Sequence, residues 1–158
     1  MSENAERVAE ALRAKIGAEP VAGDWFEITQ DRINDFADAT LDHQFIHVDP
    51  EKAAATPFGG TIAHGFLTLS MLVKLSASIK DDNPPDITGL LMGVNYGLNK
   101  VRFINPVPTG SRIRATAQTM DVALKGNSVD ETRMMVVEIE GHDKPALIAE
   151  WIGRMVFA

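Results

Sequence analysis

The stretch HGFLTLSMLVKLSASI, residues 64–79, is the part of the sequence that decides the fold. As a helix it would carry apolar side chains on nearly every side, and Lys74 is its only charged residue. A helix that is apolar nearly all round is a buried helix. At about 16 residues it is too short to span a bilayer comfortably. The stretch therefore predicts one central helix that other elements of the chain must cover.

The second half of the chain supplies the expected cover. Turn-rich clusters with the sequences NPVPTGS, KGNS and GHDKP separate four strand-like runs. The runs span residues 90–103, 113–122, 133–140 and 147–157. Gly93 and Gly97 in the first run indicate a bulge or a close backbone approach. Helices followed by long antiparallel strands indicate an α+β protein, in which a strongly curved sheet wraps around the apolar helix.

The first 60 residues contain shorter elements. The spacing of Val8, Ala9, Leu12 and Ile16 predicts an N-terminal surface helix. We expect a short strand at residues 25–28, then a helix capped by Thr29, and a further helix opened by the pair Asp49-Pro50. No repeat or linker divides the 158 residues. We therefore expect a single domain spanning 1–158, with residues 1–20 as a helical extension.

Composition excludes several classes of function. The chain has 15 Lys+Arg, 22 Asp+Glu and no cysteine, which gives a net charge of −7. Without cysteine there is no disulfide, thiolate metal site or cysteine nucleophile. An acidic chain without a basic run is a poor nucleic-acid binder. No segment resembles a membrane span, and the N-terminus lacks the apolar core of a signal peptide, so we expect a cytoplasmic protein.

Four polar residues, Asp42, His43, His47 and Asp49, crowd into eight positions. Three interpretations remain open from the residues alone. The cluster is a capped polar turn before a helix, or a metal site that uses His43 and His47, or an acid/base pair. The metal interpretation lacks a third ligand between the histidines. In the acid/base interpretation, Asp42 and His47 point into one cleft, where one takes a proton and the other orients or donates.

The pair His64-Gly65 stands at the start of the apolar helix, after a loop that contains Gly59 and Gly60. The first N–H groups of a helix have no intrahelical acceptor, and the helix dipole adds a partial positive charge there. Because glycine lets an acceptor approach the backbone, this place suits an oxyanion hole for a thioester enolate. The alternative is that the glycines only build a tight turn and that His64 is a structural histidine.

The segment FADATLDHQFIHVDPEKAAATPFGGTIAHGFLTLSML, residues 36–72, resembles the MaoC-like (R)-specific enoyl-CoA hydratases. That family carries Asp-x4-His-x-Asp and then Gly-x3-His-Gly, and the matching residues here are Asp42, His47, Asp49, Gly60, His64 and Gly65. The run YGLNKVRFINPVPTGSRIR, residues 96–114, also resembles the family's strand–turn–strand. The commoner family form has Asn-Pro at the positions of Gln44 and Phe45. The resemblance spans roughly residues 25–157 and leaves out the first helix.

The resemblance implies a hot-dog fold, in which the sheet wraps the helix of residues 64–79, and a homodimer joined edge to edge. It implies reversible hydration of a trans-2-enoyl thioester, of coenzyme A or of a carrier protein, to the (3R)-hydroxyacyl thioester. It also implies that neither metal nor cofactor is needed. A hot-dog acyl-CoA thioesterase and a non-catalytic acyl-thioester binding protein are the alternatives.

The same resemblance assigns roles to residues of this chain. Asp42 and His47 would hold the reacting water, and the Gly65 N–H would bind the thioester oxygen as charge develops. His64 and Gly60 belong to the expected substrate-binding residues. Lys100 and Arg102 are the candidates for the coenzyme A phosphates, although each is also what an exposed charge on a strand looks like.

Overall fold

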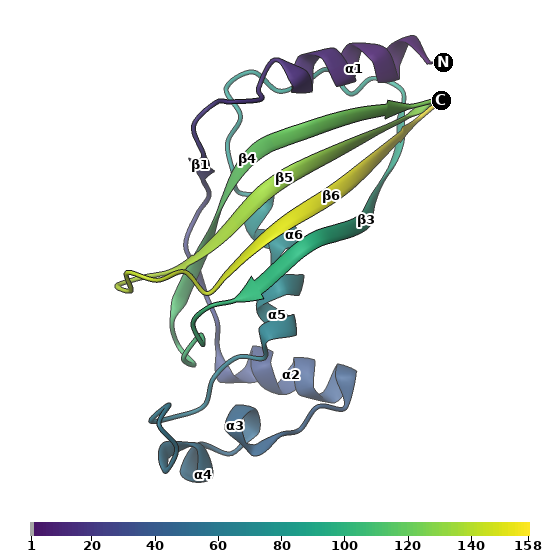
Figure 1. Cartoon of the computed structure of the whole chain (residues 1–158). Helices are drawn as coiled ribbons and strands as arrows, with labels where there is room; N and C mark the ends of the chain where they lie inside the picture. Colours follow the sequence, from purple (N-terminus) through teal and green to yellow (C-terminus); the bar gives the residue numbers. More distant parts are fainter. Residues whose placement is uncertain (1) are drawn as a thin grey trace.

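A curved antiparallel sheet lies over the helices in the computed structural model, which describes residues 2–158 (Figure 1). The strand order is β1-β4-β5-β6-β3, and β2 pairs with β4 beside this path. The strands are β1 Val21–Ala22, β2 Phe26–Glu27, β3 Leu90–Phe103, β4 Arg112–Lys125, β5 Ser128–Ile139 and β6 Leu147–Phe157. The expected α+β class and curved sheet are confirmed. The first and last long strands have the predicted bounds, whereas β4 and β5 are longer than predicted, and β1 was not predicted.

The predicted central helix is present but divided. It consists of α5 (Gly65–Ser70) and α6 (Leu72–Ser76), which meet at Met71. Backbone hydrogen bonds run through the junction, since the Met71 N–H donates to Leu67 O at 2.9 Å. The Ser70 hydroxyl donates to Phe66 O at 2.7 Å. Such side-chain bonds to the preceding turn bend helices, which accounts for the division.

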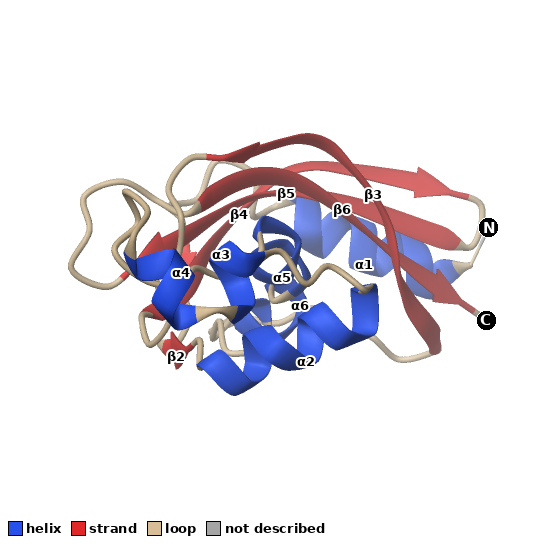
Figure 2. Ribbon diagram, turned by 90° about the horizontal axis from the view of Figure 1, so that it is seen from below, coloured by secondary structure: helices blue, strands red, loops and turns tan. Residues whose placement is uncertain are grey.

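One face of this helix pair is not covered, so the prediction of burial all round was wrong. Phe66 is 68% exposed and Val73 is 54% exposed. The opposite face is buried, because Leu67, Leu72 and Leu75 belong to one core with residues of the sheet. Figure 2 shows α5 and α6 under the concave side of that sheet. The sheet residues of this core include Ile113, Ala115, Met135, Val137, Ile139, Leu147 and Ala149.

Helix α1 (Glu3–Arg13) covers the end of the sheet that the central helix does not reach (Figure 1). Its buried face consists of Ala5, Val8, Ala9 and Leu12. Three of these, Val8, Ala9 and Leu12, were predicted from the spacing, whereas the predicted Ile16 lies beyond the helix and is 45% exposed. These side chains form a second core with Val122, Val129 and Phe157. The N-terminal extension is therefore packed against the same sheet.

The other end of the molecule gathers α2 (Gln30–Thr40), α3 (Phe45–Val48) and α4 (Pro50–Ala54) (Figure 1). Both predicted caps are confirmed: Thr29 accepts from the Arg32 N–H at 3.2 Å, and Asp49 accepts from the Lys52 N–H at 3.1 Å. The predicted bulge in β3 is confirmed by a register shift at Asn95/Gly97. Within residues 2–158, the helices are too short or too polar to cross a membrane.

Candidate active site

A left-handed residue directs the chain into the site. Leu41 caps α2 with a φ of 62°, a conformation that a bulky side chain rarely adopts. Such backbone costs on the order of 1–3 kcal/mol and persists where the surroundings hold it. Here the main-chain carbonyl of the next residue, Asp42, accepts a hydrogen bond from His64 Nε2 at 2.9 Å. The turn therefore delivers the Asp42 carboxylate beside two histidines.

His47 lies on α3 and is buried. Its Nδ1 donates to the main-chain carbonyl of Ile62 at 2.7 Å. Since a carbonyl only accepts, this bond fixes the tautomer with the proton on Nδ1 and a free lone pair on Nε2. Burial, the largest effect, lowers the pKa of His47 below its usual value. The Ile62 bond comes next and opposes this shift, His64 lowers the pKa further, and Asp42 raises it slightly. His47 is therefore a neutral acceptor at neutral pH.

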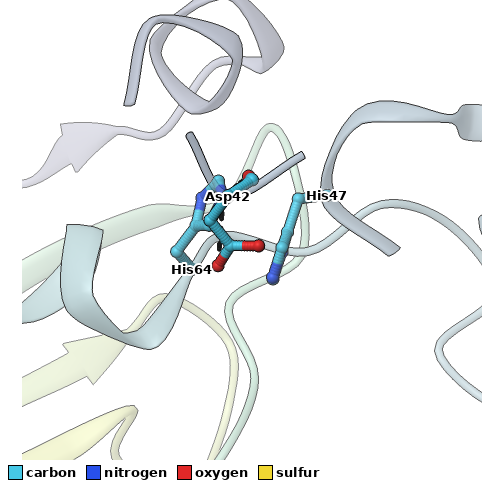
Figure 3. A group of neighbouring side chains, drawn as sticks. All are labelled: Asp42, His47 and His64. Carbon is cyan, nitrogen blue, oxygen red and sulfur yellow. Dashed lines mark hydrogen bonds and ion pairs between the residues drawn. The ribbon is translucent and has the colours of Figure 1, made fainter. Parts of the chain in front are cut away.

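His64 completes a compact group with these two residues (Figure 3). Its ring stacks on that of His47, with centroids 3.9 Å apart and planes 25° apart. The ring of Phe36 lies on another side at 5.0 Å. His64 is buried, and its Nδ1 has no hydrogen-bond partner among the described residues. The Asp42 carboxylate oxygens point toward the gap between the two imidazoles in Figure 3.

The geometry favours proton transfer over metal binding. Ligand atoms of Asp42, His47 and His64 lie within 4.8 Å of one another, as a loose metal site would need. A ring nitrogen binds a metal in the plane of its ring, at about 2.0–2.1 Å for zinc. Two stacked rings have nearly parallel planes, which do not converge on one ion at that distance. The pair His43 and His47 is not assembled either, because His43 Nε2 pairs with Asp38 at 2.8 Å in solvent.

An apolar cavity of about 290 Å³ opens beside His47 and Gly65. Gly65 is the first residue of α5, and the side chain of its N-cap, His64, makes no cap bond. A Cβ atom on Gly65 would lie 3.1 Å from the ring of Phe103. The absence of a side chain therefore both exposes the helix start and makes room for Phe103. The remaining walls are Phe58, Ile62, Ala63, Thr68, Ile104, Asn105, Pro106, Val107 and Ala146.

Of the predicted site residues, His47 and Gly65 line this cavity, and Asp42 and His64 lie next to His47. The other predicted residues lie further out. Gly60 is in the loop before Thr61, and a side chain there would meet nothing within 4 Å. Lys100 is exposed on β3, with its Nζ 3.8 Å from the Glu150 carboxylate. Arg102 is exposed and donates to the carbonyl of Val101 at 2.7 Å. The structure brings Asp42, His47, His64 and Gly65 together, and it leaves Gly60, Lys100 and Arg102 around them.

Sequence reasoning missed two residues that shape the site. Ile62 acts through its main-chain carbonyl, and Phe103 acts as a wall of the cavity. A backbone carbonyl leaves no mark in a sequence. Phe103 had one available signal, its place at the end of a strand directly before a turn cluster. Asp49 proved to be a helix cap, as the capped-turn interpretation expects. Asp42 Oδ1 also accepts from the Gln44 N–H, at 3.4 Å, and in addition lies beside His47 and His64.

The sequence of the chain was compared with those of known proteins and families. The family model described as MaoC like domain matches residues 11–140. The 3-hydroxyacyl-thioester dehydratase Z of Mycobacterium tuberculosis is 51% identical over 152 residues, covering 96% of this chain and 97% of that protein. Nodulation protein N of Rhizobium leguminosarum is 50% identical, covering 91% of this chain and 88% of that protein.

Among solved structures, an (R)-hydratase from A. caviae superposes with a TM-score of 0.66 at 21% identity. The match covers 85% of this chain and 92% of that chain. At this identity the likeness concerns the fold, and it confirms the hot-dog architecture.

We expect His47 to titrate below 6.5, the ordinary value for an imidazole. Burial disfavours the charged ring, so a lower pH is needed to protonate it. The pH titration of the His47 ring by NMR measures this directly. The same group should place the acid limb of a pH–rate profile below 6.5, because the protonated ring has no lone pair to offer. A titration midpoint at or above 6.5 would contradict the site geometry.

Proposed function

The chain belongs to the MaoC-like dehydratase family and is a hydro-lyase, and from this we propose that it hydrates trans-2-enoyl thioesters reversibly to (3R)-hydroxyacyl thioesters. The observation that carries the proposal is that His47 and Gly65 line one apolar cavity, while the Asp42 carboxylate lies beside the neutral His47 ring. An apolar cavity accepts an acyl chain, and the three polar groups match the three needs of the reaction.

The first need is a held water molecule. Asp42 and His47 both present acceptors, since the carboxylate has only lone pairs and His47 keeps its proton on Nδ1. One water can donate one hydrogen to each, which turns an oxygen lone pair toward the substrate. Holding the water and the C3 carbon in this geometry replaces an encounter in solution and contributes several kcal/mol.

The reaction then needs a base and an acid on the same face of the double bond. The water oxygen bonds to C3 as Asp42 takes one proton, and the π electrons of the C2–C3 bond move into the thioester as an enolate. The same proton passes from Asp42 to C2, and the thioester carbonyl re-forms. Water is added syn overall, with Asp42 as acid/base and His47 as the orienting acceptor.

The third need is a donor for the enolate oxygen, which we assign to the Gly65 N–H at the start of α5. One such donor is worth on the order of 10²–10³ in rate. The thioester is itself the electron sink, so the proposed reaction requires no metal or redox cofactor. His64 stacks on His47, and His64 and Gly60 are proposed substrate-binding residues. Lys100 and Arg102 are the proposed contacts of the coenzyme A phosphates.

Asp42→Asn and His47→Gln should each lower hydration of an enoyl-CoA by at least about 10², the usual scale for losing an acid/base group. Loss of the enoyl absorbance measures the rate. His43→Ala is the matched control and should cost little, because His43 pairs with Asp38 in solvent. Near-wild-type turnover in either site variant removes that residue from the mechanism.

Incubation with an enoyl-CoA also separates the two alternative functions. A thioesterase would release free coenzyme A, which a thiol reagent detects. A binding protein would hold crotonyl-CoA without changing its absorbance. Enoyl-CoA substrates from C4 to C16, and the matching carrier-protein thioesters, would define the substrate. A cytoplasmic location stays a prediction.

Gly65→Val should lower kcat/KM sharply for each folded molecule, because a side chain here displaces Phe103 or shifts the start of α5. Gly59→Ala is the control. Gly59 has a φ of +71° but open space around it, so the alanine should act through stability alone. Activity is measured well below the melting temperature of each variant. Normal turnover in folded Gly65→Val would show that Gly65 serves packing and not the thioester oxygen.

We further propose a homodimer formed along β3. This strand is an edge of the sheet, with β6 as its one partner among the described strands. An unpaired edge is an association surface that proteins usually cover. Exposed apolar side chains gather on it and on the adjacent uncovered face of α5 and α6: Leu91, Met92, Val94, Tyr96, Leu98, Phe103, Phe66 and Val73.

Val94→Lys should shift the dimer toward monomer, because it places a charge in the proposed interface. Met120→Lys is the matched control, since Met120 is an exposed methionine on β4. Light scattering at micromolar concentration reports the mass. A wild-type monomer under these conditions would contradict the proposed assembly.

A further inference from the structure

His47 is held at two of its atoms by segments that are far from it in the sequence. Its ring Nδ1 donates to the Ile62 carbonyl at 2.7 Å. Its own main-chain carbonyl accepts from the side-chain amide of Gln30, also at 2.7 Å. Gln30 is the first residue of α2, and Ile62 lies just before α5. Three separate segments therefore meet at one histidine.

The Gln30 amide makes bonds in every direction that its chemistry allows. Besides His47 O, its Nε2 donates to Asn34 Oδ1 at 2.9 Å. Its Oε1 accepts from the Thr61 hydroxyl at 2.6 Å, and that hydroxyl lies 2.7 Å from the hydroxyl of Thr109. Both amide protons and the carbonyl oxygen are used, so a flipped amide would lose these bonds. Gln30 therefore has one stable orientation.

The partners of this amide are the two segments that must stay in register for His47 to work. Thr61 directly precedes Ile62, whose carbonyl holds the His47 ring. The main chain repeats the link, because the Ile62 N–H donates to Ile46 O at 3.0 Å. Gln30 bridges α3 and the Thr61–Ile62 segment. Its bonds fix how far the His47 ring stands from the Ile62 carbonyl.

We propose that Gln30 is a positioning residue that sets the tautomer of His47 and the orientation of its ring. This inference rests on the proposed hydratase function. Without the bridge, α3 moves against the Thr61–Ile62 segment and the Nδ1 bond lengthens. The ring proton then divides between Nδ1 and Nε2, and only part of the molecules offer the Nε2 lone pair to water. A misplacement of about 1 Å is enough to cost 10² in rate.

The test compares Gln30→Met, Gln30→Glu and Gln118→Met. Met keeps the length of the side chain without the amide. Glu keeps the shape and an acceptor but has no N–H for His47 O. Gln118 is the matched control, because its Nε2 also donates to a backbone carbonyl, Ala18 O at 2.9 Å, on a distant part of the molecule. Thr61→Val removes the hydroxyl donor to Gln30 and serves as a second route if a Gln30 variant fails to fold.

Two readouts are measured on folded protein: kcat and KM for enoyl-CoA hydration, and the ¹⁵N shifts of the His47 ring above its titration range. We expect kcat to fall by about 10- to 100-fold with little change in KM, and the ring shifts to move from the Nδ1–H tautomer toward a mixture. Gln30→Glu should be at least as impaired as Gln30→Met. Gln118→Met should change the melting temperature at most.

Unchanged kcat and an unchanged His47 tautomer in folded Gln30→Met, or in Thr61→Val, would overturn the proposal. A fall in kcat with an unchanged tautomer would also overturn it, since Gln30 would then act by another route. The NMR readout needs no turnover. If the wild-type protein hydrates no enoyl thioester but Gln30→Met still changes the His47 tautomer, the positioning role of Gln30 is supported and the proposed function is rejected.

Discussion

The hydrogen bond from His47 to the Ile62 carbonyl is the interaction on which the site depends. It joins the helical end of the molecule, where α3 lies, to the strand-like segment that leads into the central helix. That segment is itself tied to the turn after β3, through the Ala63 N–H and Val107 O at 2.8 Å. The sheet, the central helix and α3 thus meet through backbone groups. The His47 side chain keeps its orientation at this junction, because the three elements are bonded to one another.

The same junction explains why a costly arrangement persists. Two imidazoles are buried in contact, next to a left-handed leucine, and each feature is unfavourable by itself. Hydrogen bonds from both histidines to backbone carbonyls, of Ile62 and Asp42, offset the loss of solvent. Burial in turn keeps His47 uncharged, which a water-orienting acceptor requires. The energetic cost and the proposed chemistry come from the same desolvation.

Contacts between residues that are close in the sequence could be predicted, and contacts between distant residues could not. The Thr29 and Asp49 caps bond three residues along the chain, and both were predicted. The spacing of Asp42 and His47 left three interpretations open, and the resemblance to the family favoured the acid/base pair; the structure places the two side chains close together. The contacts that link residues 30, 47, 61 and 62 cross 15 to 31 positions, and no local pattern encodes them. The prediction that the central helix is buried all round failed for a related reason. Its composition indicated burial but could not show which side the sheet would leave open.

That open side connects the fold to the site. Phe103 is a wall of the cavity and, at 50% exposure, also belongs to the uncovered apolar face of β3. Its ring meets Phe66 edge to face at 6.0 Å, and it occupies the space that the missing side chain of Gly65 leaves. A second copy that covered this face would press on Phe103 from outside and exclude water from that wall of the cavity. Low dielectric strengthens every charge interaction inside a site, including that of the Gly65 N–H with a developing enolate. On this argument the proposed dimer contact and the proposed catalytic donor share one aromatic side chain, so association would contribute to catalysis by closing the site.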